Sequence, residues 1–144
     1  MQIAHTEPHP MLRCLEMMVG TWRIDGREAG TEGEIHGQVV FEWMEGGFFL
    51  LQHVDLVRVG ETVKGIEYIG YDEVSKTLKS HYFGTTGDLL EYVWEPIDYT
   101  LTIWVGEIGS PACYRSKFSN NFNTNVGRWE WPGGGYDITM TRVA

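Results

Sequence analysis

The chain has 144 residues, of which 42% are hydrophobic and 22% are charged, and its formal net charge at pH 7 is -9. This length favours a single domain, and an aromatic content of 13% supplies enough apolar volume for a core, which excludes a disordered chain. The acidic balance repels phosphate backbones and anionic membrane surfaces. We therefore expect neither nucleic acid nor a membrane as a partner.

The N-terminal residues show none of the features of a signal peptide, which needs a basic segment followed by an apolar run. No stretch reaches the roughly 18 uninterrupted apolar residues of a membrane-spanning helix. The expected location is the cytoplasm. Cys14 and Cys113 lack a C-x-x-C spacing, so they are expected as two free thiols, with a disulfide left open.

The first predicted element is a short helix over residues 10–19. Pro10 suits a first helical turn, and Gly20 ends the pattern. The apolar residues of this segment fall on one helical face: Met11, Leu12, Leu15, Met18 and Val19. The Pro-rich residues 1–9 before it predict a flexible, solvated arm that contains His5 and His9, and residues 10–144 are expected to form the domain.

The rest of the chain has strand chemistry, with β-branched and aromatic residues interrupted by glycine. We predict strands at 21–28, 34–45, 48–59, 62–71, 77–84, 89–95, 100–106, 112–119, 126–131 and 136–142. The connections are mostly short, so successive strands pair antiparallel. Since about ten strands would leave two long edges unless the sheet closes, the predicted fold is an all-β, closed, up-and-down antiparallel barrel with the helix closing one end. A two-sheet sandwich is the alternative.

Two residues far apart in the sequence predict how the barrel closes. Trp22 lies in Gly20-Thr21-Trp22 at the start of the first strand, and Arg142 lies near the end of the last. First and last strands are neighbours in a closed barrel, so the guanidinium can lie over the indole face. The pair resembles the Gly-x-Trp and late-arginine signature of the calycin superfamily, which includes lipocalins and fatty-acid-binding proteins, and its implied role is structural.

Further segments extend the resemblance over about residues 11–142. They are Val19-Gly-Thr-Trp-Arg, Phe41-Glu-Trp-Met-Glu-Gly-Gly-Phe-Phe-Leu, Ile69-Gly-Tyr-Asp, His81-Tyr-Phe and Gly127-Arg-Trp-Glu-Trp. Together they resemble an uncharacterised bacterial lipocalin-like family, loosely similar to nitrobindins. Nitrobindin similarity would imply haem held by a histidine near the C-terminus, but His81 is the last histidine of this chain. We therefore expect no haem and no other cofactor.

Aromatic residues at alternating positions predict the lining of an interior pocket, because alternate strand residues share a face. Ordinary packing of the same side chains is the alternative. The candidate ligand-binding residues are Trp43, His53, Tyr68, His81, Tyr92, Trp94, Trp104 and Trp129.

The ionisable candidates for catalysis are His53, Glu67 and His81, with Tyr68 beside them. A turn at Gly60-Glu61 would pair Val54 with Glu67 and His53 with Tyr68. A five-residue loop at 72–76 would then set Glu67 opposite His81, and this carboxylate–imidazole pair would suit proton transfer. A one-residue slip would separate the pair, and a solvated surface pair is the alternative. A metal site is not expected, because no histidines are closely spaced on one element.

These observations leave three functions open. The first is binding of a small hydrophobic or aromatic molecule inside the barrel. The second is a cofactorless isomerase, cyclase or lyase that uses the acid–base pair, so whether the protein is an enzyme stays open. The third is an interaction module with a filled core. Strands that are apolar on both faces, such as the segments at Phe48-Phe49-Leu50-Leu51 and Leu89-Leu90, predict a homodimer.

Overall fold

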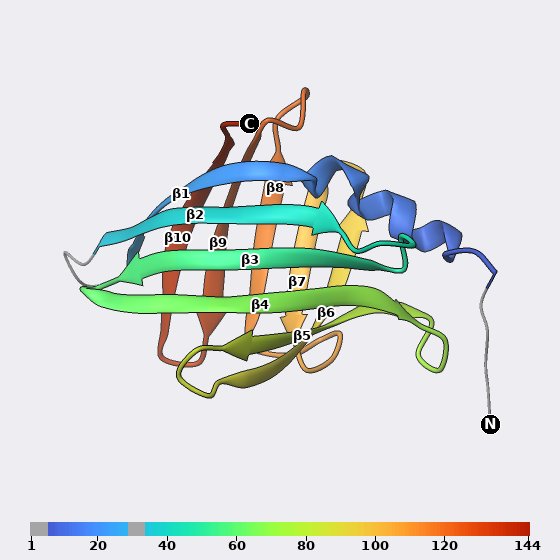
Figure 1. Cartoon of the computed structure of the whole chain (residues 1–144). Coiled ribbons are helices and arrows are strands. Elements are labelled where there is room, and N and C mark those ends of the chain that lie inside the picture. Colours follow the sequence, from blue (N-terminus) through green and yellow to red (C-terminus); the bar gives the residue numbers. More distant parts are fainter. Residues whose placement is uncertain (1–5, 29–33) are drawn as a thin grey trace.

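The computed structural model describes residues 6–28 and 34–144, which form one 3₁₀ helix and ten strands (Figure 1). The elements are η1 (Pro10–Met18), β1 (Gly20–Glu28), β2 (Glu34–Trp43), β3 (Phe49–Arg58), β4 (Glu61–Asp72), β5 (Thr77–Gly84), β6 (Leu89–Ile97), β7 (Thr100–Val105), β8 (Cys113–Phe118), β9 (Thr124–Trp131) and β10 (Gly134–Arg142). Each predicted strand is confirmed, with bounds that differ by at most two residues.

Every strand pairs antiparallel with its sequence neighbours, and β1 pairs with β10 to close the barrel. Figure 1 shows β1 to β4 crossing in front of β7 to β10, so that the strands enclose one interior. The closed antiparallel barrel is therefore confirmed, and the two-sheet sandwich is wrong. Closure removes the free edges that ten short strands would otherwise present.

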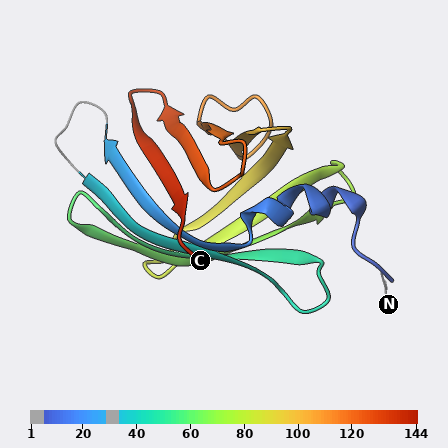
Figure 2. The same cartoon turned by 90° about the horizontal axis from the view of Figure 1, so that it is seen from above.

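The helix η1 packs on the core at one end of the barrel. Its residues Leu12, Leu15 and Met18 are buried, and the Trp22 indole donates a 2.8 Å hydrogen bond to the Met18 carbonyl. Seen from above, the strands curve around a common interior, and η1 lies beside them on the side of the N-terminal arm (Figure 2). No helix within the described residues is long and apolar enough to cross a membrane.

The predicted contact between Trp22 and Arg142 is confirmed. The guanidinium carbon lies 4.2 Å from the centre of the indole ring, and the two residues are direct partners across β1 and β10. The guanidinium also donates to the carbonyls of Val19 and Phe122 and to the Asn123 side chain. This arginine therefore joins β10 to the end of η1 and to the loop before β9.

The N-terminal arm is attached to the barrel at its last residue. His9 is exposed, as predicted, but its ring stacks on Tyr71 of β4 at 3.6 Å and its Nδ1 accepts a hydrogen bond from the Met11 amide. Residues 1–5 of the predicted arm, including His5, lie outside the described residues.

Both predicted hairpin registers are wrong. The β3–β4 turn uses Val59 and Gly60, at φ of 50° and 79°, so the register moves by two residues and Gln52 replaces Val54 opposite Glu67. Valine rarely adopts a positive φ, which is why sequence alone misplaced this turn. A shift of two residues leaves the same side chains of β3 and β4 together on one face of the hairpin.

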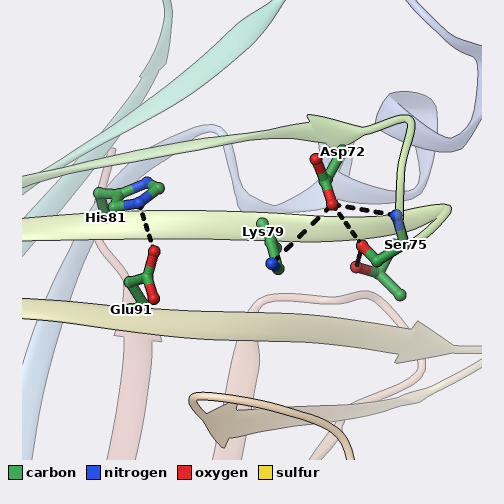
Figure 3. Close-up of polar contacts among 6 residues, drawn as sticks. Asp72, Ser75, Lys79, His81 and Glu91 are labelled. Atoms are coloured by element: carbon green, nitrogen blue, oxygen red, sulfur yellow. Dashed lines mark hydrogen bonds and ion pairs between the residues drawn. The ribbon is translucent and has the colours of Figure 1, made fainter.

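The β4–β5 turn is one residue shorter than predicted, and this changes which side chains of β5 share a face with those of β4. Asp72 pairs directly with Thr77, its carboxylate accepts hydrogen bonds from the amide and hydroxyl of Ser75, and Lys76 takes a φ of 58° (Figure 3). These hydrogen bonds, with nearby Lys79, lower the pKa of Asp72. The one-residue difference sets His81 opposite Tyr68 instead of Glu67.

The outer face carries apolar residues as well as charges. Phe83 and Leu89 are direct partners on β5 and β6 and are 49% and 65% exposed. Farther along the same face, Val93, Trp104 and Cys113 form a small buried cluster. Cys113 is a buried free thiol and Cys14 an exposed one. The homodimer expected from the apolar surface stays a prediction.

Candidate functional site

The barrel encloses a cavity of about 250 Å³. It extends from Met18, the last residue of η1, to Asp88 and Leu90, which are exposed at the opposite end of the strands. Most of the lining side chains are apolar or aromatic. They are Met18, Ile24, Val39, Phe41, Val54, Leu56, Val63, Tyr82, Leu90, Tyr92, Trp94, Leu101, Ile103, Tyr114, Trp129, Tyr136, Ile138 and Met140, with Gln52, Glu67 and Asp88 among them.

Glu67 is the one buried carboxyl group among the described residues, with 5% of its surface exposed. Its Oε1 accepts a 2.8 Å hydrogen bond from the Gln52 amide on β3, and its Oε2 accepts a 2.9 Å hydrogen bond from the Trp94 indole on β6. Burial raises the pKa of Glu67 above its ordinary value, against hydrogen bonds from Ser80, Trp94 and Gln52 that lower it. The carboxyl group therefore keeps its proton to a higher pH than an exposed glutamate does.

Tyr82 lies next to Glu67 in register, as its direct partner on β5. Its side chain is 7% exposed, and its hydroxyl is buried without a hydrogen-bond partner among the described residues. The ring fits because position 65 is glycine: a Cβ there would come within 2.5 Å of the hydroxyl. Burial first, then the charges of Asp88 and Glu67, raise the pKa of this phenol. Tyr82 lines the cavity, and its hydroxyl is a donor and acceptor without a partner among the described residues.

Aromatic rings form much of the remaining wall. Trp94 meets Phe41 edge-on at 6.2 Å between ring centres, and Trp129 contacts both Tyr92 at 5.8 Å and Tyr114 at 5.4 Å. The Tyr114 hydroxyl is already used, since it donates a 2.7 Å hydrogen bond to the side chain of Asn125. Burial raises the pKa of Tyr92 and of Tyr114, so both phenols stay neutral in ordinary buffers.

An arginine lies at the open end of the barrel, the end away from η1. The guanidinium of Arg58 lies 4.9 Å from the ring centre of Tyr136 and 5.4 Å from that of Trp131, and it donates a 2.6 Å hydrogen bond to Glu28. Burial raises the pKa of Tyr136 to about 12, against the lowering effect of Arg58. Arg58 therefore holds the ends of β1, β3 and β10 together, and its charge is paired with Glu28.

Four predicted site residues line the cavity, and they come from β4, β6 and β9. They are Glu67, Tyr92, Trp94 and Trp129. Four others lie on the outer face of the barrel and cannot reach a molecule inside it. They are His53, Tyr68, His81 and Trp104.

The outer-face residues have partners of their own. His81 Nε2 lies 2.7 Å from the exposed carboxylate of Glu91 (Figure 3). His53 Nε2 lies 3.6 Å from Glu42, and the Tyr68 ring contacts Phe83 edge-on at 6.1 Å. The predicted Glu67–His81 pair is therefore wrong, because the shorter β4–β5 turn sends these side chains to opposite faces.

Two tryptophans predicted to bind a ligand have their contacts outside the cavity. Trp104 packs in the outer cluster, donates to Glu95 at 3.2 Å and lies under the guanidinium of Arg115. Trp43 donates a 2.6 Å hydrogen bond to Glu16 and so joins β2 to η1. Both indoles have structural contacts that account for their positions.

Sequence reasoning missed the lining residues Gln52 and Tyr82 and the buried Ser80 beside Trp94. A usable signal was present in β5, where Lys79, His81 and Phe83 alternate with Leu78, Ser80 and Tyr82. A lysine is almost never buried without a partner. Lys79 is therefore expected to face outward together with His81 and Phe83, and Tyr82 to face inward.

A larger hollow of about 520 Å³ lies on the surface beside η1. Its lining includes three glutamates, Glu7, Glu45 and Glu73, and the stacked rings of His9 and Tyr71. All three glutamates are exposed to solvent. The interior cavity, with its buried carboxyl and hydroxyl groups, is the stronger candidate for a ligand site.

Comparison with protein families identifies the family of the chain. A family model described as "Protein of unknown function (DUF1579)" matches residues 7–94. The chain belongs to this family. The match to DUF1579 runs from the N-terminal arm to Trp94 in β6, so it includes Glu67, Gln52 and Tyr82 of the cavity.

A solved structure has the same fold as this DUF1579 protein. It is described as "De novo design of a fluorescence-activating beta barrel", and it matches with a TM-score of 0.52 and 13% identity over 90% of this chain and 97% of the designed one. At this identity the likeness shows the barrel fold alone. A search among curated proteins found no match.

Proposed function

We propose that the protein binds one small, mainly apolar or aromatic molecule in the barrel interior, with a polar group of that molecule beside Glu67 and Tyr82. Tyr82 lines this interior cavity with a buried hydroxyl that has no partner among the described residues, and this observation carries the proposal. Buried polar groups in proteins nearly always have hydrogen-bond partners, and an unmade hydrogen bond costs about 1–3 kcal/mol. A ligand hydrogen-bonded to Tyr82 would remove that cost.

The volume of the cavity limits the size of the ligand. An apolar cavity of about 150 Å³ is enough for benzene, and pockets for drug-sized ligands start near about 300 Å³. The 250 Å³ here suits a substituted single ring or a fused pair of rings. A fatty acid with a long chain does not fit this volume.

Two likenesses support a binding role. The solved structure with the same fold is described as a fluorescence-activating barrel. The sequence resembles lipocalin-like proteins, whose barrels hold small molecules. Both agree with a cavity that is lined mainly by rings and aliphatic side chains.

The other two functions have less support. The enzyme alternative used either Glu67 with His81 or His53 with Tyr68. The first two residues lie on opposite faces of β4 and β5, and the second two lie outside the cavity and are not direct partners. The interaction module required a filled core, whereas the interior leaves about 250 Å³. We therefore propose neither of them.

Titration with three matched naphthalene derivatives tests the binding role. Naphthalenemethanol, naphthylmethylamine and naphthylacetate share the ring and differ in charge. We expect at least one of them to bind with one molecule per chain by calorimetry and to change the tryptophan fluorescence, because Trp94 and Trp129 line the cavity.

Two valines of β3 supply a matched pair of variants. Val54 faces the cavity and Val57 lies on the outer face, and both are half-buried. Val54→Phe should abolish binding because the new ring fills the cavity, whereas Val57→Phe should keep it. Absence of binding by all three probes, or binding that Val54→Phe leaves unchanged, would overturn the proposal.

A further inference from the structure

We propose that the natural ligand of the cavity is an amine, bound as an ammonium ion that pairs with the carboxylate of Glu67. This inference rests on the proposed function and adds the chemical class of the ligand. It follows from the hydrogen bonds of Glu67, from the charges around the cavity and from the rings beside the carboxyl group.

The hydrogen bonds of Glu67 suit the ionised form of the carboxyl group. Both oxygens accept from N–H donors, Oε1 from Gln52 at 2.8 Å and Oε2 from Trp94 at 2.9 Å. An ionised carboxylate only accepts hydrogen bonds and has about four lone-pair positions, so acceptor capacity is left for a ligand. The site is thus built around an anion.

No positive side chain compensates this anion. Among the described residues that line the cavity there is no lysine, arginine or histidine, and Asp88 adds a second carboxyl group near the open end. Arg58 at the open end is paired with Glu28 at 2.6 Å. A buried carboxylate without a counter-ion is unfavourable, so without a cation beside it the Glu67 carboxyl group favours its protonated form. A ligand cation would take the place of that proton.

The rings around Glu67 also favour a cation. The Trp94 indole donates to the carboxyl group, Phe41 lies edge-on to Trp94 at 6.2 Å, and Tyr92 lines the cavity on the same strand as Trp94. The faces of aromatic rings attract cations, most strongly where water is excluded. A carboxylate among aromatic rings is the arrangement that recognises an ammonium group on an apolar body.

The charge of the whole chain acts in the same direction. With a net charge of -9, the surface attracts cations toward the barrel and repels anions. A carboxylate ligand would meet Glu67 and Asp88 with no unpaired cation among the described lining residues. We therefore expect the cavity to reject naphthylacetate.

The order of affinities in the probe series tests the inference on the unmodified protein. We expect naphthylmethylamine to bind at least about tenfold more tightly than naphthalenemethanol, because a charge-assisted hydrogen bond is about twice as strong as a neutral one. Naphthylacetate should bind most weakly. If naphthalenemethanol binds as tightly as the amine, the amine inference is wrong and the binding role stands. If no probe binds, the binding role itself fails.

Replacement of Glu67 by glutamine removes the charge with little change of shape. Glu67→Gln should lower the affinity for naphthylmethylamine about tenfold or more and should change the affinity for naphthalenemethanol by less than about threefold. The control is Glu91→Gln, because Glu91 is an exposed glutamate on the outer face of β6. An equal loss of affinity for both probes in Glu67→Gln, or the same loss in Glu91→Gln, would overturn the inference.

A pH series provides a second measurement of the role of Glu67. Affinity for naphthylmethylamine should fall as acid protonates Glu67, and affinity for naphthalenemethanol should not. The other titratable groups around the cavity are Asp88 and four tyrosines, Tyr82, Tyr92, Tyr114 and Tyr136, whose pKa values burial raises. A fall that persists in Glu67→Gln would contradict the role of Glu67.

Discussion

The buried carboxyl group of Glu67 predicts how the stability of the protein changes with pH. In the unfolded chain this group has an ordinary pKa near 4.5, and in the fold burial raises the pKa. Between these two values the folded state holds a proton that the unfolded state has lost. Stability is therefore highest at or below the unfolded pKa and falls as the pH rises through the window toward the folded pKa.

Glu67→Gln replaces the titrating carboxyl group with an amide, so the contribution of this proton to the free energy of unfolding is lost. The difference in unfolding free energy, variant minus wild type, should grow by at most about 1.4 kcal/mol per pH unit within the window and level off above the folded pKa. The slope has this limit because only one group differs between the two proteins. Other titrating groups cancel in the difference, since they are shared.

Urea unfolding at a series of pH values measures the difference directly, with tryptophan fluorescence as the signal. Glu91→Gln is the control, because its carboxylate is 59% exposed, and its difference from wild type should stay within about 0.5 kcal/mol at every pH. A difference for Glu67→Gln that does not change with pH, or that shrinks as the pH rises, would refute the argument from burial.

Three further predictions concern single side chains. Tyr82→Phe should leave the unfolding free energy unchanged or raise it by up to about 2 kcal/mol, because the hydroxyl has no partner among the described residues; a clear loss in thermal unfolding would contradict this. Arg142→Met should lower the unfolding free energy by about 2–4 kcal/mol, through loss of the contact with Trp22 and of the bonds to carbonyl groups, and a loss under about 1 kcal/mol would argue against that role. A thiol reagent should modify Cys14 in the native protein and Cys113 only after unfolding, as peptide mapping would show; equal rates would contradict the burial of Cys113.

Part of the candidate site could be predicted from alternation along single strands. Tyr92 and Trp94 share a face of β6, and both line the cavity as predicted. Lys79, the one lysine, arginine or acidic residue of β5, would also have assigned the outer face of that strand. Used in this way, Lys79 places His81 outside, because a charged side chain stays in water unless it is paired. The same rule does not place Glu67, since β4 carries charged residues on both faces.

Local chemistry in the sequence determined the elements and their order in the barrel. Glycine-rich turns between β-branched and aromatic runs define ten strands, the apolar spacing after Pro10 defines the helix, and Trp22 and Arg142 identify the strands that close the sheet. Each of these signals acts over a few residues or through one recognisable pair. Their outcome therefore does not depend on the rest of the fold.

Only the tertiary structure decided which residues meet. The two turns that position Glu67 depend on positive φ values at Val59 and Lys76. Neither valine nor lysine is a residue type for which a positive φ is expected from sequence. One residue less in the second turn exchanged His81 for Tyr82 opposite Glu67. Side chains alternate between the two faces of a strand, so a single residue of register separates a surface histidine from the wall of the cavity.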